Sequence, residues 1–336
     1  MKQTTIKILI IFSFITTAFN GSGQDPHFSQ FYTTPLYVSP SYTGATPRGR
    51  AVLNFRTQWI NLPKAFTTFL FSYDNNFQKK NFGLGINLFR DQAGTGRIAY
   101  TGGSALYSYN FIVREKFSIR PGISFSFYQI SNDFLRHTFY DQINLDGDNL
   151  TVTKDNFINK TQLYPDAAAS VMLHTKDYWI GFTAHHLLQQ NQSLIEAEDI
   201  IHEKFTVFAG ANVYIGRKLS RHKYHTLSFA TIYQKQGPFN QMDFLLMWKK
   251  YPYAAGLSYR GMPVFDRHVD YYRSMDAVTL HLGYNYEEWR FGYSYDLTIS
   301  KLATATGGAH EISIVYELDE LLTPRKHKGA IPCPKI

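Results

Sequence analysis

Apolar and polar side chains alternate along most of the chain after residue 50. In residues 117–127, with the sequence FSIRPGISFSF, the odd positions carry Phe, Ile and one Pro, and the even positions carry Ser, Arg and Gly. Residues 205–215 and 289–297 repeat this pattern. A period of two indicates β-strands that have one apolar face and one polar face.

Fourteen segments carry this signal, and their number is even. We expect strands at 50–58, 66–74, 81–90, 99–111, 116–130, 164–174, 177–187, 203–216, 222–234, 239–250, 251–260, 275–286, 288–299 and 308–318.

The connections between these strands differ in length in a regular way. The long ones, 131–163, 188–202 and 261–274, are all odd-numbered, whereas even-numbered ones such as 174–177 are short. A soluble β-sandwich has no reason to place every long loop at one end, but an outer-membrane barrel does. The sequence therefore predicts an all-β fold, a transmembrane outer-membrane β-barrel of about 14 antiparallel strands. Four tryptophans near strand ends are predicted to join the interfacial aromatic girdles: Trp59, Trp179, Trp248 and Trp289.

The first 23 residues have the features of a secretory signal peptide. Lys2 and Lys7 precede a short apolar stretch at 8–15, and Gly21 and Gly23 offer a cleavage site. The apolar stretch is much shorter than the roughly 20 residues of a membrane span. We therefore expect export, with a mature chain that begins at Gln24.

Charge and cysteine content exclude two further classes. The formal net charge of +8 falls to +6 (8 − 2) without Lys2 and Lys7, and the basic residues are dispersed apart from 217–223 and 323–328. A nucleic-acid-binding protein would concentrate them on one face, so no nucleic-acid partner is expected. Cys333 is the single cysteine, which rules out an intramolecular disulfide. We expect it to be buried in a tail at the periplasmic rim, with an intermolecular disulfide as the alternative.

Both ends of the chain resemble a known family. Residues 24–44 contain a Gln-Asp-Pro-x-Phe-Ser-Gln run followed by spaced Pro, Leu and aromatic positions, and residues 295–318 and 332–336 are similar to the family's closing block. On this basis the chain resembles the PorP/SprF proteins of type IX secretion. Ser39 and Ser41 depart from the Asn and Ala that are common there. The residues that carry the match at the N-terminal end are Gln24, Asp25, Pro26, Phe28, Ser29, Gln30, Pro35, Leu36, Pro40, Tyr42 and Gly44.

The resemblance implies an outer-membrane barrel that serves type IX secretion and gliding motility, without catalysis and without a cofactor. Family members help large secreted proteins, often adhesins, to reach the cell surface and stay there. Others associate with periplasmic ring and peptidoglycan-binding components. The implied partners are thus a secreted cargo protein, through its C-terminal region, and outer-membrane lipid.

The segment 24–48 is apolar and contains four prolines. Each proline removes a hydrogen-bond donor, so the segment cannot pair as a strand. We expect it to act as a plug in the lumen or across the periplasmic mouth, either simply filling space or docking a partner. The residues assigned to this plug are Asp25, Pro26, Phe28, Phe31, Tyr32, Pro35, Pro40 and Tyr42.

Other groups of residues give only weak evidence for a metal site. Residues 144–155 have some spacing of a calcium loop but carry Asn149 where Gly is required, and His185 and His186 should point to opposite faces of a strand. A second histidine pair, His222 and His225, lacks the Cys or carboxylate residues that usually complete a metal site. We therefore predict no metal site. The charged residues of the polar face should pair across strands, or line a permeation path: Arg56, Arg120, Arg290, Asp296, Glu311 and Glu317.

The predicted organisation is a signal peptide at 1–23, a plug-like segment at 24–48, a barrel at 49–319 and a periplasmic tail at 320–336. The expected function is non-enzymatic support of the secretion or surface anchoring of a partner. The outer loops of the barrel would contact this partner through four aromatic residues: Phe139, Tyr140, Tyr271 and Tyr272. The alternatives are an outer-membrane channel for a small solute and a structural link to a periplasmic ring.

Overall fold

The computed structural model describes residues 25–62, 65–94, 98–114, 117–133, 160–194, 198–215, 225–261, 275–299 and 306–318. Among these residues, no helix is long and apolar enough to cross a membrane. Short helical turns occur at α2 (Pro35–Val38), η1 (Pro40–Tyr42) and η2 (Gln78–Lys80). The strands are β1 (Arg50–Gln58), β2 (Phe66–Phe77), β3 (Phe82–Ala93), β4 (Ile98–Tyr109), β5 (Phe111–Arg114), β6 (Phe117–Asn132), β7 (Lys160–His174), β8 (Tyr178–His185), β9 (Lys204–Ile215), β10 (His225–Gln236), β11 (Phe239–Lys250), β12 (Tyr253–Gly261), β13 (Met275–Tyr286), β14 (Trp289–Thr298) and β15 (Ala309–Glu317).

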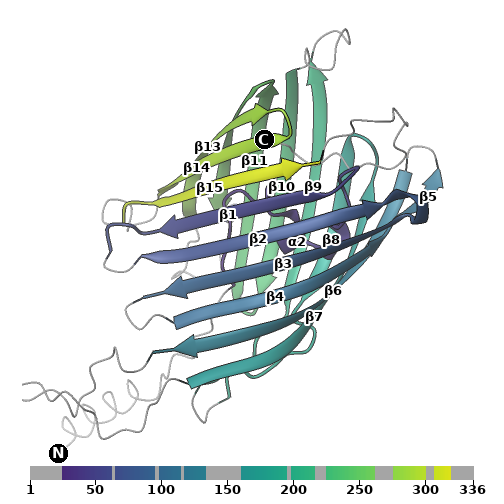
Figure 1. The fold of residues 1–336 in the computed structure, drawn as a ribbon. Coiled ribbons are helices and arrows are strands. Elements are labelled where there is room, and N and C mark those ends of the chain that lie inside the picture. The colour runs from purple at the N-terminus through teal and green to yellow at the C-terminus, as the bar shows by residue number, and fades with distance from the viewer. Residues whose placement is uncertain are drawn as a thin grey trace, which may run out of the picture.

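These strands form one closed antiparallel barrel (Figure 1). Consecutive strands pair with each other, except that β4 and β5 both pair with β6, and β1 pairs with β15 from Arg50↔Glu317 to Gln58↔Ala309, which closes the ring. A closed ring leaves no unpaired sheet edge at its seam, as a lipid environment requires.

The prediction of fourteen strands is confirmed, because β4 and β5 are two parts of one strand. Both pair with β6, and the register continues from Ser108↔Gly122 to Phe111↔Ile119. The break between them lies opposite Arg120 and Pro121, and a proline nitrogen has no hydrogen to donate to the ladder. The sequence pattern ran through this break without indicating it.

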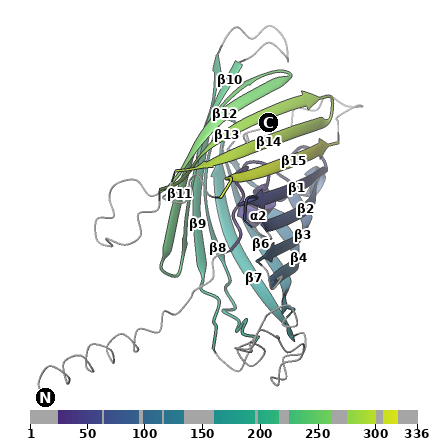
Figure 2. The same cartoon turned by 90° about the vertical axis from the view of Figure 1, so that its left-hand side faces the viewer.

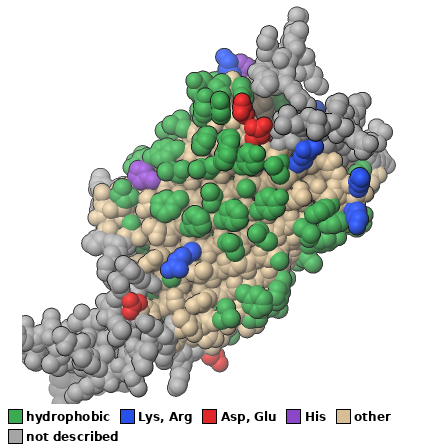
Figure 3. Space-filling view, viewed as in Figure 1, with side chains coloured by type: hydrophobic (Ala, Val, Ile, Leu, Met, Phe, Trp, Pro, Cys, Tyr) green, Lys and Arg blue, Asp and Glu red, His purple; other side chains and the backbone are tan. Residues whose placement is uncertain are grey.

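The two faces of the wall differ as the alternation predicts. On β1, Leu53 and Phe55 are exposed on the outer face, whereas Asn54 and Arg56 are 1% and 3% exposed and face inward. Figure 3 shows hydrophobic side chains spread over the outer wall, with few charged groups among them. An apolar exterior around a polar interior is the arrangement of an outer-membrane barrel.

The two ends of the barrel differ in their connections. The connections 133–159, 186–203 and 262–274 lie at one end, which we call the loop end. Those at the opposite turn end include 175–177, 251–252 and 287–288. Long loops of outer-membrane barrels face outward, so the loop end is extracellular and the turn end periplasmic.

The aromatic girdle prediction holds for two tryptophans and is wrong for Trp179. Trp248 and Trp289 are exposed near the turn end. Trp179 is instead buried in the lumen, because it alternates with the outward-facing Tyr178 and Ile180. Its ring packs over Gly210, where an added Cβ would lie 2.1 Å from the ring. Trp59 lies at the loop end with a positive φ of 60°.

Candidate functional site

The N-terminal segment, residues 25–49, lies inside the barrel. Both ribbon views show α2 enclosed by the strands (Figures 1 and 2). Its apolar side chains form the centre of the protein's core: Phe28, Tyr32, Leu36, Val38 and Tyr42 are 2–5% exposed. Of the residues predicted for this segment, Pro35 and Pro40 are also buried, while Asp25, Pro26 and Phe31 are half-buried.

The prolines of the segment begin short helical turns rather than extended strands. Pro35 starts α2 and Pro40 starts η1, where the fixed φ of proline is favourable and its missing N–H costs nothing. The Ser39 side chain accepts a hydrogen bond from the Ser41 backbone N–H and caps η1. The segment is therefore compact and fits within the lumen.

Two inward-facing glycines bring the barrel wall against this segment's backbone. A Cβ added at Gly122 of β6 would lie 2.4 Å from the Ser41 nitrogen, and one at Gly83 of β3 would lie 2.4 Å from the Thr43 carbonyl oxygen. Backbone atoms cannot move aside as a flexible side chain can. The alternating sequence pattern does not distinguish these two glycines from others, because only the folded chain shows what faces them.

Replacing Gly122 with Ala should therefore displace the segment from the wall. The expected result is faster cleavage of residues 25–49 by a protease added to the detergent-solubilised barrel, while the strands remain resistant. Gly103→Ala is the matched control, since a Cβ there would meet nothing closer than 3.4 Å. Equal cleavage of the two variants would contradict the close packing described here.

Polar groups of the segment are bonded to β14 and β15. The Ser29 N–H donates to Glu311 Oε2 (2.7 Å), and the Gln30 side chain donates to the Glu311 carbonyl (3.0 Å). Ser313 Oγ donates in return to Gln30 Oε1 (2.7 Å). Buried polar groups need such partners, so these bonds fix the segment's position along the lumen.

A buried ion network surrounds Ser29. Asp296 Oδ2 accepts from Arg56 Nη2 (2.9 Å), Arg260 Nη1 (3.1 Å) and Ser29 Oγ (2.6 Å). Arg56 also lies 3.5 Å from Glu311. The cross-strand pairing predicted for Arg56, Asp296 and Glu311 is thus confirmed.

The other charged residues predicted for the lumen have two kinds of partner. Arg290 and Glu317 form an ion pair on adjacent strands, as predicted. Arg120 donates instead to the Gly44 carbonyl of the N-terminal segment (3.0 Å). The sequence pattern predicted that Arg120 would pair with a charged residue on another strand. It could not indicate this contact, because the N-terminal segment is not part of the strand pattern.

The first described residue, Asp25, is held by three barrel residues. His186 Nε2 donates to Asp25 Oδ2 (2.9 Å), and Lys204 Nζ donates to the same oxygen (3.0 Å). Gln236 donates to Asp25 Oδ1 (3.1 Å). Burial raises the pKa of Asp25, but His186 and Lys204 outweigh it and hold the pKa well below its usual range. The Asp25 carboxylate is therefore charged and anchored near the loop end.

His186 is protonated in this arrangement. Its two ring nitrogens face Asp25 and Asp166, at 2.9 and 2.8 Å. Burial lowers the pKa of His186, but these carboxylates more than offset burial and raise it to about 9. The expectation that His185 and His186 point to opposite faces is wrong: β8 ends at His185, His186 has a φ of 58°, and the two rings lie 6.4 Å apart inside the barrel.

Above Asp25 a cavity of about 700 Å³ opens at the loop end. We call it the vestibule. Asp25, Pro26 and His27 contribute to its lining, with residues from β1–β4, β6 and β10–β15. Its polar wall includes Arg56, Asp91, Gln241, Arg260 and Asp296, and its aromatic wall includes Trp59, Phe66 and Tyr100.

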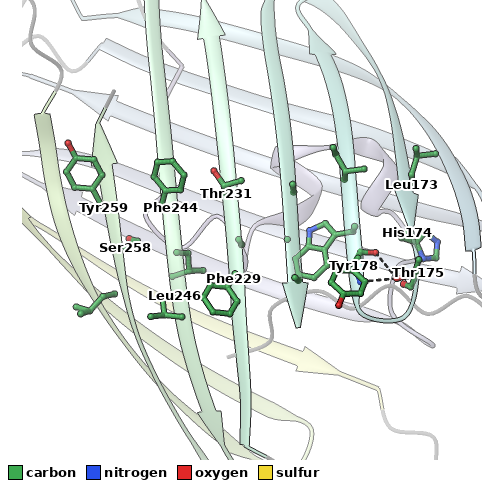
Figure 4. A pocket seen from close by; sticks show the side chains of 18 of the residues that line it. Leu173, His174, Thr175, Tyr178, Phe229, Thr231, Phe244, Leu246, Ser258 and Tyr259 are labelled. Atoms are coloured by element: carbon green, nitrogen blue, oxygen red, sulfur yellow. Dashed lines mark hydrogen bonds between the residues drawn. The ribbon is translucent and has the colours of Figure 1, made fainter. Parts of the chain in front are cut away.

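A second hollow, of about 850 Å³, involves the outer wall over β7–β12 (Figure 4). Exposed apolar side chains such as Ile180, Phe229 and Leu246 contribute to it, beside the small Ala209 and Ala211 of β9. These side chains point away from the lumen. The hollow therefore faces lipid and is separate from the vestibule.

Several predicted features lie outside the described residues. They are Phe139, Tyr140, Tyr271, Tyr272, the calcium-like loop 144–155, His222, Cys333, the leader 1–23 and the tail 320–336. Within the described ranges, no group of three or more His, Cys, Asp and Glu side chains could hold a metal ion.

Several solved structures are similar to this chain in their strand arrangement. The outer membrane protein Omp33 of Acinetobacter baumannii has 6% identity and a TM-score of 0.44, covering 82% of this chain and 100% of that chain. A FadL homologue of Pseudomonas aeruginosa has 10% identity and a TM-score of 0.43, covering 85% and 94%. The KdgM porin has 10% identity and a TM-score of 0.36, covering 80% and 99%. These values are too low to bear on activity or substrate.

No curated protein matches the sequence. The family described as "Type IX secretion system membrane protein PorP/SprF" matches residues 20–316, which is most of the chain. That range contains the N-terminal segment and every strand of the barrel except the last residue of β15, Glu317. The chain therefore belongs to the PorP/SprF family of type IX secretion system membrane proteins and is an outer-membrane β-barrel.

Proposed function

We propose that this barrel supports the secretion or surface anchoring of a partner protein, such as an adhesin, without catalysing a reaction. Family membership makes it a type IX secretion component of the outer membrane. The observation that carries the proposal is the burial of the N-terminal segment among the lumenal side chains. A lumen packed in this way favours a scaffold that presents its outer surface to a partner, since a porin keeps a water-filled lumen.

The docking surface in this proposal is the set of outer loops. Phe139 and Tyr140 in 131–163, and Tyr271 and Tyr272 in 261–274, supply aromatic side chains of the kind that dominates protein interfaces. The partner would be the C-terminal region of an exported protein. In the same proposal, residues 1–23 are removed on export and residues 320–336 form a periplasmic tail that contacts ring or peptidoglycan-binding components.

The direct test is to purify the tagged barrel from its native membrane in mild detergent and identify what accompanies it by mass spectrometry. A single large secreted protein at near-equal stoichiometry would support surface anchoring. Periplasmic ring components in its place would support a role within the secretion machine. A barrel that carries neither would contradict the proposal and favour the solute channel.

A loop deletion tests the docking surface. Removing residues 135–158 should release the partner from the cell surface, because the deletion removes Phe139 and Tyr140 without touching a described strand. Partner retention is measured by surface immunolabelling, after gel mobility with and without heating has confirmed a folded barrel. The double variant Tyr271→Ser and Tyr272→Ser provides a second readout that leaves the chain length unchanged. Full retention in both variants would exclude these loops as the docking surface.

The runner-up function is an outer-membrane channel for a small solute. The vestibule favours it, since a cavity of about 700 Å³ at the extracellular mouth is within the usual size range of a ligand site. In that case the N-terminal segment would act as a hatch rather than as permanent filling.

A further inference from the structure

The vestibule contains a buried carboxylate oxygen that no described residue satisfies. Asp296 is 2% exposed and contributes to the vestibule lining. Its Oδ2 atom accepts three hydrogen bonds, from Ser29, Arg56 and Arg260, whereas its Oδ1 atom has no partner within the described ranges. A buried acceptor without a partner is costly, so this atom calls for a hydrogen-bond donor.

A second carboxylate with spare acceptor capacity lines the same cavity. Asp91 of β3 is half-buried, and its Oδ1 accepts from Thr68 Oγ1 (2.6 Å). A carboxylate has about four acceptor positions, so Asp91 can still bind a donor that enters from the vestibule. Asp91 lies on β3 and Asp296 on β14, with β2, β1 and β15 between them, so a bound polypeptide would contact the two carboxylates through separate donors.

The cations of the vestibule are directed to acids of the barrel. Arg56 contacts Asp296 and Glu311, and Arg260 contacts Asp243 and Asp296. His27 contacts Asp243, but burial, reinforced by Arg260, lowers the pKa of His27, so its ring adds no full positive charge at neutral pH. The lining therefore offers hydrogen-bond acceptors to a ligand, whereas its strongest donors, Arg56 and Arg260, are engaged with acids of the barrel.

We propose that the vestibule binds a cationic nitrogen group, a guanidinium or an ammonium, and that an exported protein supplies it as an Arg or Lys side chain. The second part of this inference rests on the proposed function. The cation forms charge-assisted hydrogen bonds to one of the two carboxylates, Asp296 or Asp91, and a backbone N–H of the same polypeptide donates to the other. Trp59 and Tyr100 line the same cavity, and aromatic rings attract a cation that lies over their faces.

The test uses the full-length barrel in neutral detergent and isothermal titration calorimetry. The probe is the blocked peptide acetyl-Gly-Arg-Gly-amide, and the matched control peptide carries citrulline, which keeps the shape of Arg and removes its charge. We expect the Arg peptide to bind at least tenfold more tightly than the citrulline peptide, and to bind more weakly as salt is added. Equal binding of the two peptides, or no binding of either, would overturn the proposal.

Two barrel variants locate the site. Asp91→Asn should weaken binding of the Arg peptide at least tenfold, because it removes a carboxylate that the peptide contacts. The variant should still fold, since Asp91 is not part of the ion network that orders the lumen. Asp296→Asn should weaken it further if the variant folds. Glu287→Gln is the matched control, because Glu287 lies in the turn between β13 and β14 at the opposite end. Binding that survives Asp91→Asn unchanged would overturn this placement of the site.

The free amine agmatine distinguishes the sources of the cation. Binding of the Arg peptide at least tenfold tighter than agmatine supports a polypeptide ligand, and equal binding of both supports the cation site while overturning the polypeptide source. These measurements use the purified barrel alone. Their failure would leave partner retention on cells unaffected, and loss of partner retention would not alter the titration.

Discussion

Deleting residues 25–45 should convert a closed barrel into a conducting one. Fourteen strands enclose a lumen wider than that of eight-stranded barrels, which their own side chains just fill, and approach the strand number of water-filled porins. In this protein the space is occupied by the buried side chains of Phe28, Tyr32, Leu36 and Tyr42. We expect conductance in planar bilayers to rise roughly tenfold or more over the full-length barrel.

Because the deletion removes part of the core, a milder variant is needed beside it. The double substitution Phe28→Ala and Tyr32→Ala keeps the chain through the lumen but removes two of its largest side chains. Deleting residues 135–155 in an outer loop is the control of matched length. Each barrel is first checked for folding by its gel mobility with and without heating. A full-length barrel that already conducts as well as the deletion would exclude a sealing role and support the solute channel.

Replacing Arg56 with Met should strongly destabilise the barrel. Arg56 is 3% exposed and contacts Asp296, Glu311 and the Ser29 hydroxyl. Removing one partner of a buried ion network leaves the others uncompensated, which costs about 3–5 kcal/mol. We expect a loss of this size in the free energy of unfolding, measured by urea titration in detergent with tryptophan fluorescence.

Arg90→Met provides the control for this substitution. Arg90 lies on β3 and is exposed on the outer face, so the same exchange should change the free energy of unfolding by less than about 1 kcal/mol. Equal effects of the two substitutions would mean that the lumenal network does not hold the barrel together. The same result would weaken the argument that this network positions Ser29 and the N-terminal segment.

The strand pattern was readable from the sequence because its physical cause is local. A residue whose neighbours on both sides face lipid must itself face the lumen, so Arg56 was correctly assigned to the polar face, next to the exposed Phe55. The same rule, applied consistently, would also have placed Trp179 inside. The girdle prediction for Trp179 failed because it used position along the strand and ignored the direction of the side chain.

The contents of the lumen could be predicted only in outline. The prolines of residues 24–48 showed that this segment does not pair as a strand, and its aromatic side chains indicated that it should be covered. Which groups receive it depends on residues up to 283 positions away, such as Ser313 for Gln30. No local pattern encodes such a distance. In the sequence, Gly83 and Gly122 look like ordinary glycines within strands. Their role becomes clear only in the structure, where the backbone of the N-terminal segment packs against them.

The sequence by itself determined the strand number, the two faces of the wall and the end from which the long loops extend, because alternation and loop length are properties of consecutive residues. The tertiary structure decided the closure of β1 on β15, the break opposite Pro121 and the anchoring of Asp25 by His186 and Lys204. It also formed the vestibule, where Asp296 Oδ1 has no hydrogen-bond partner among the described residues. Apart from the break, each of these brings together atoms that are remote in the chain, and the energies depend on burial and distances that exist only once the barrel has closed.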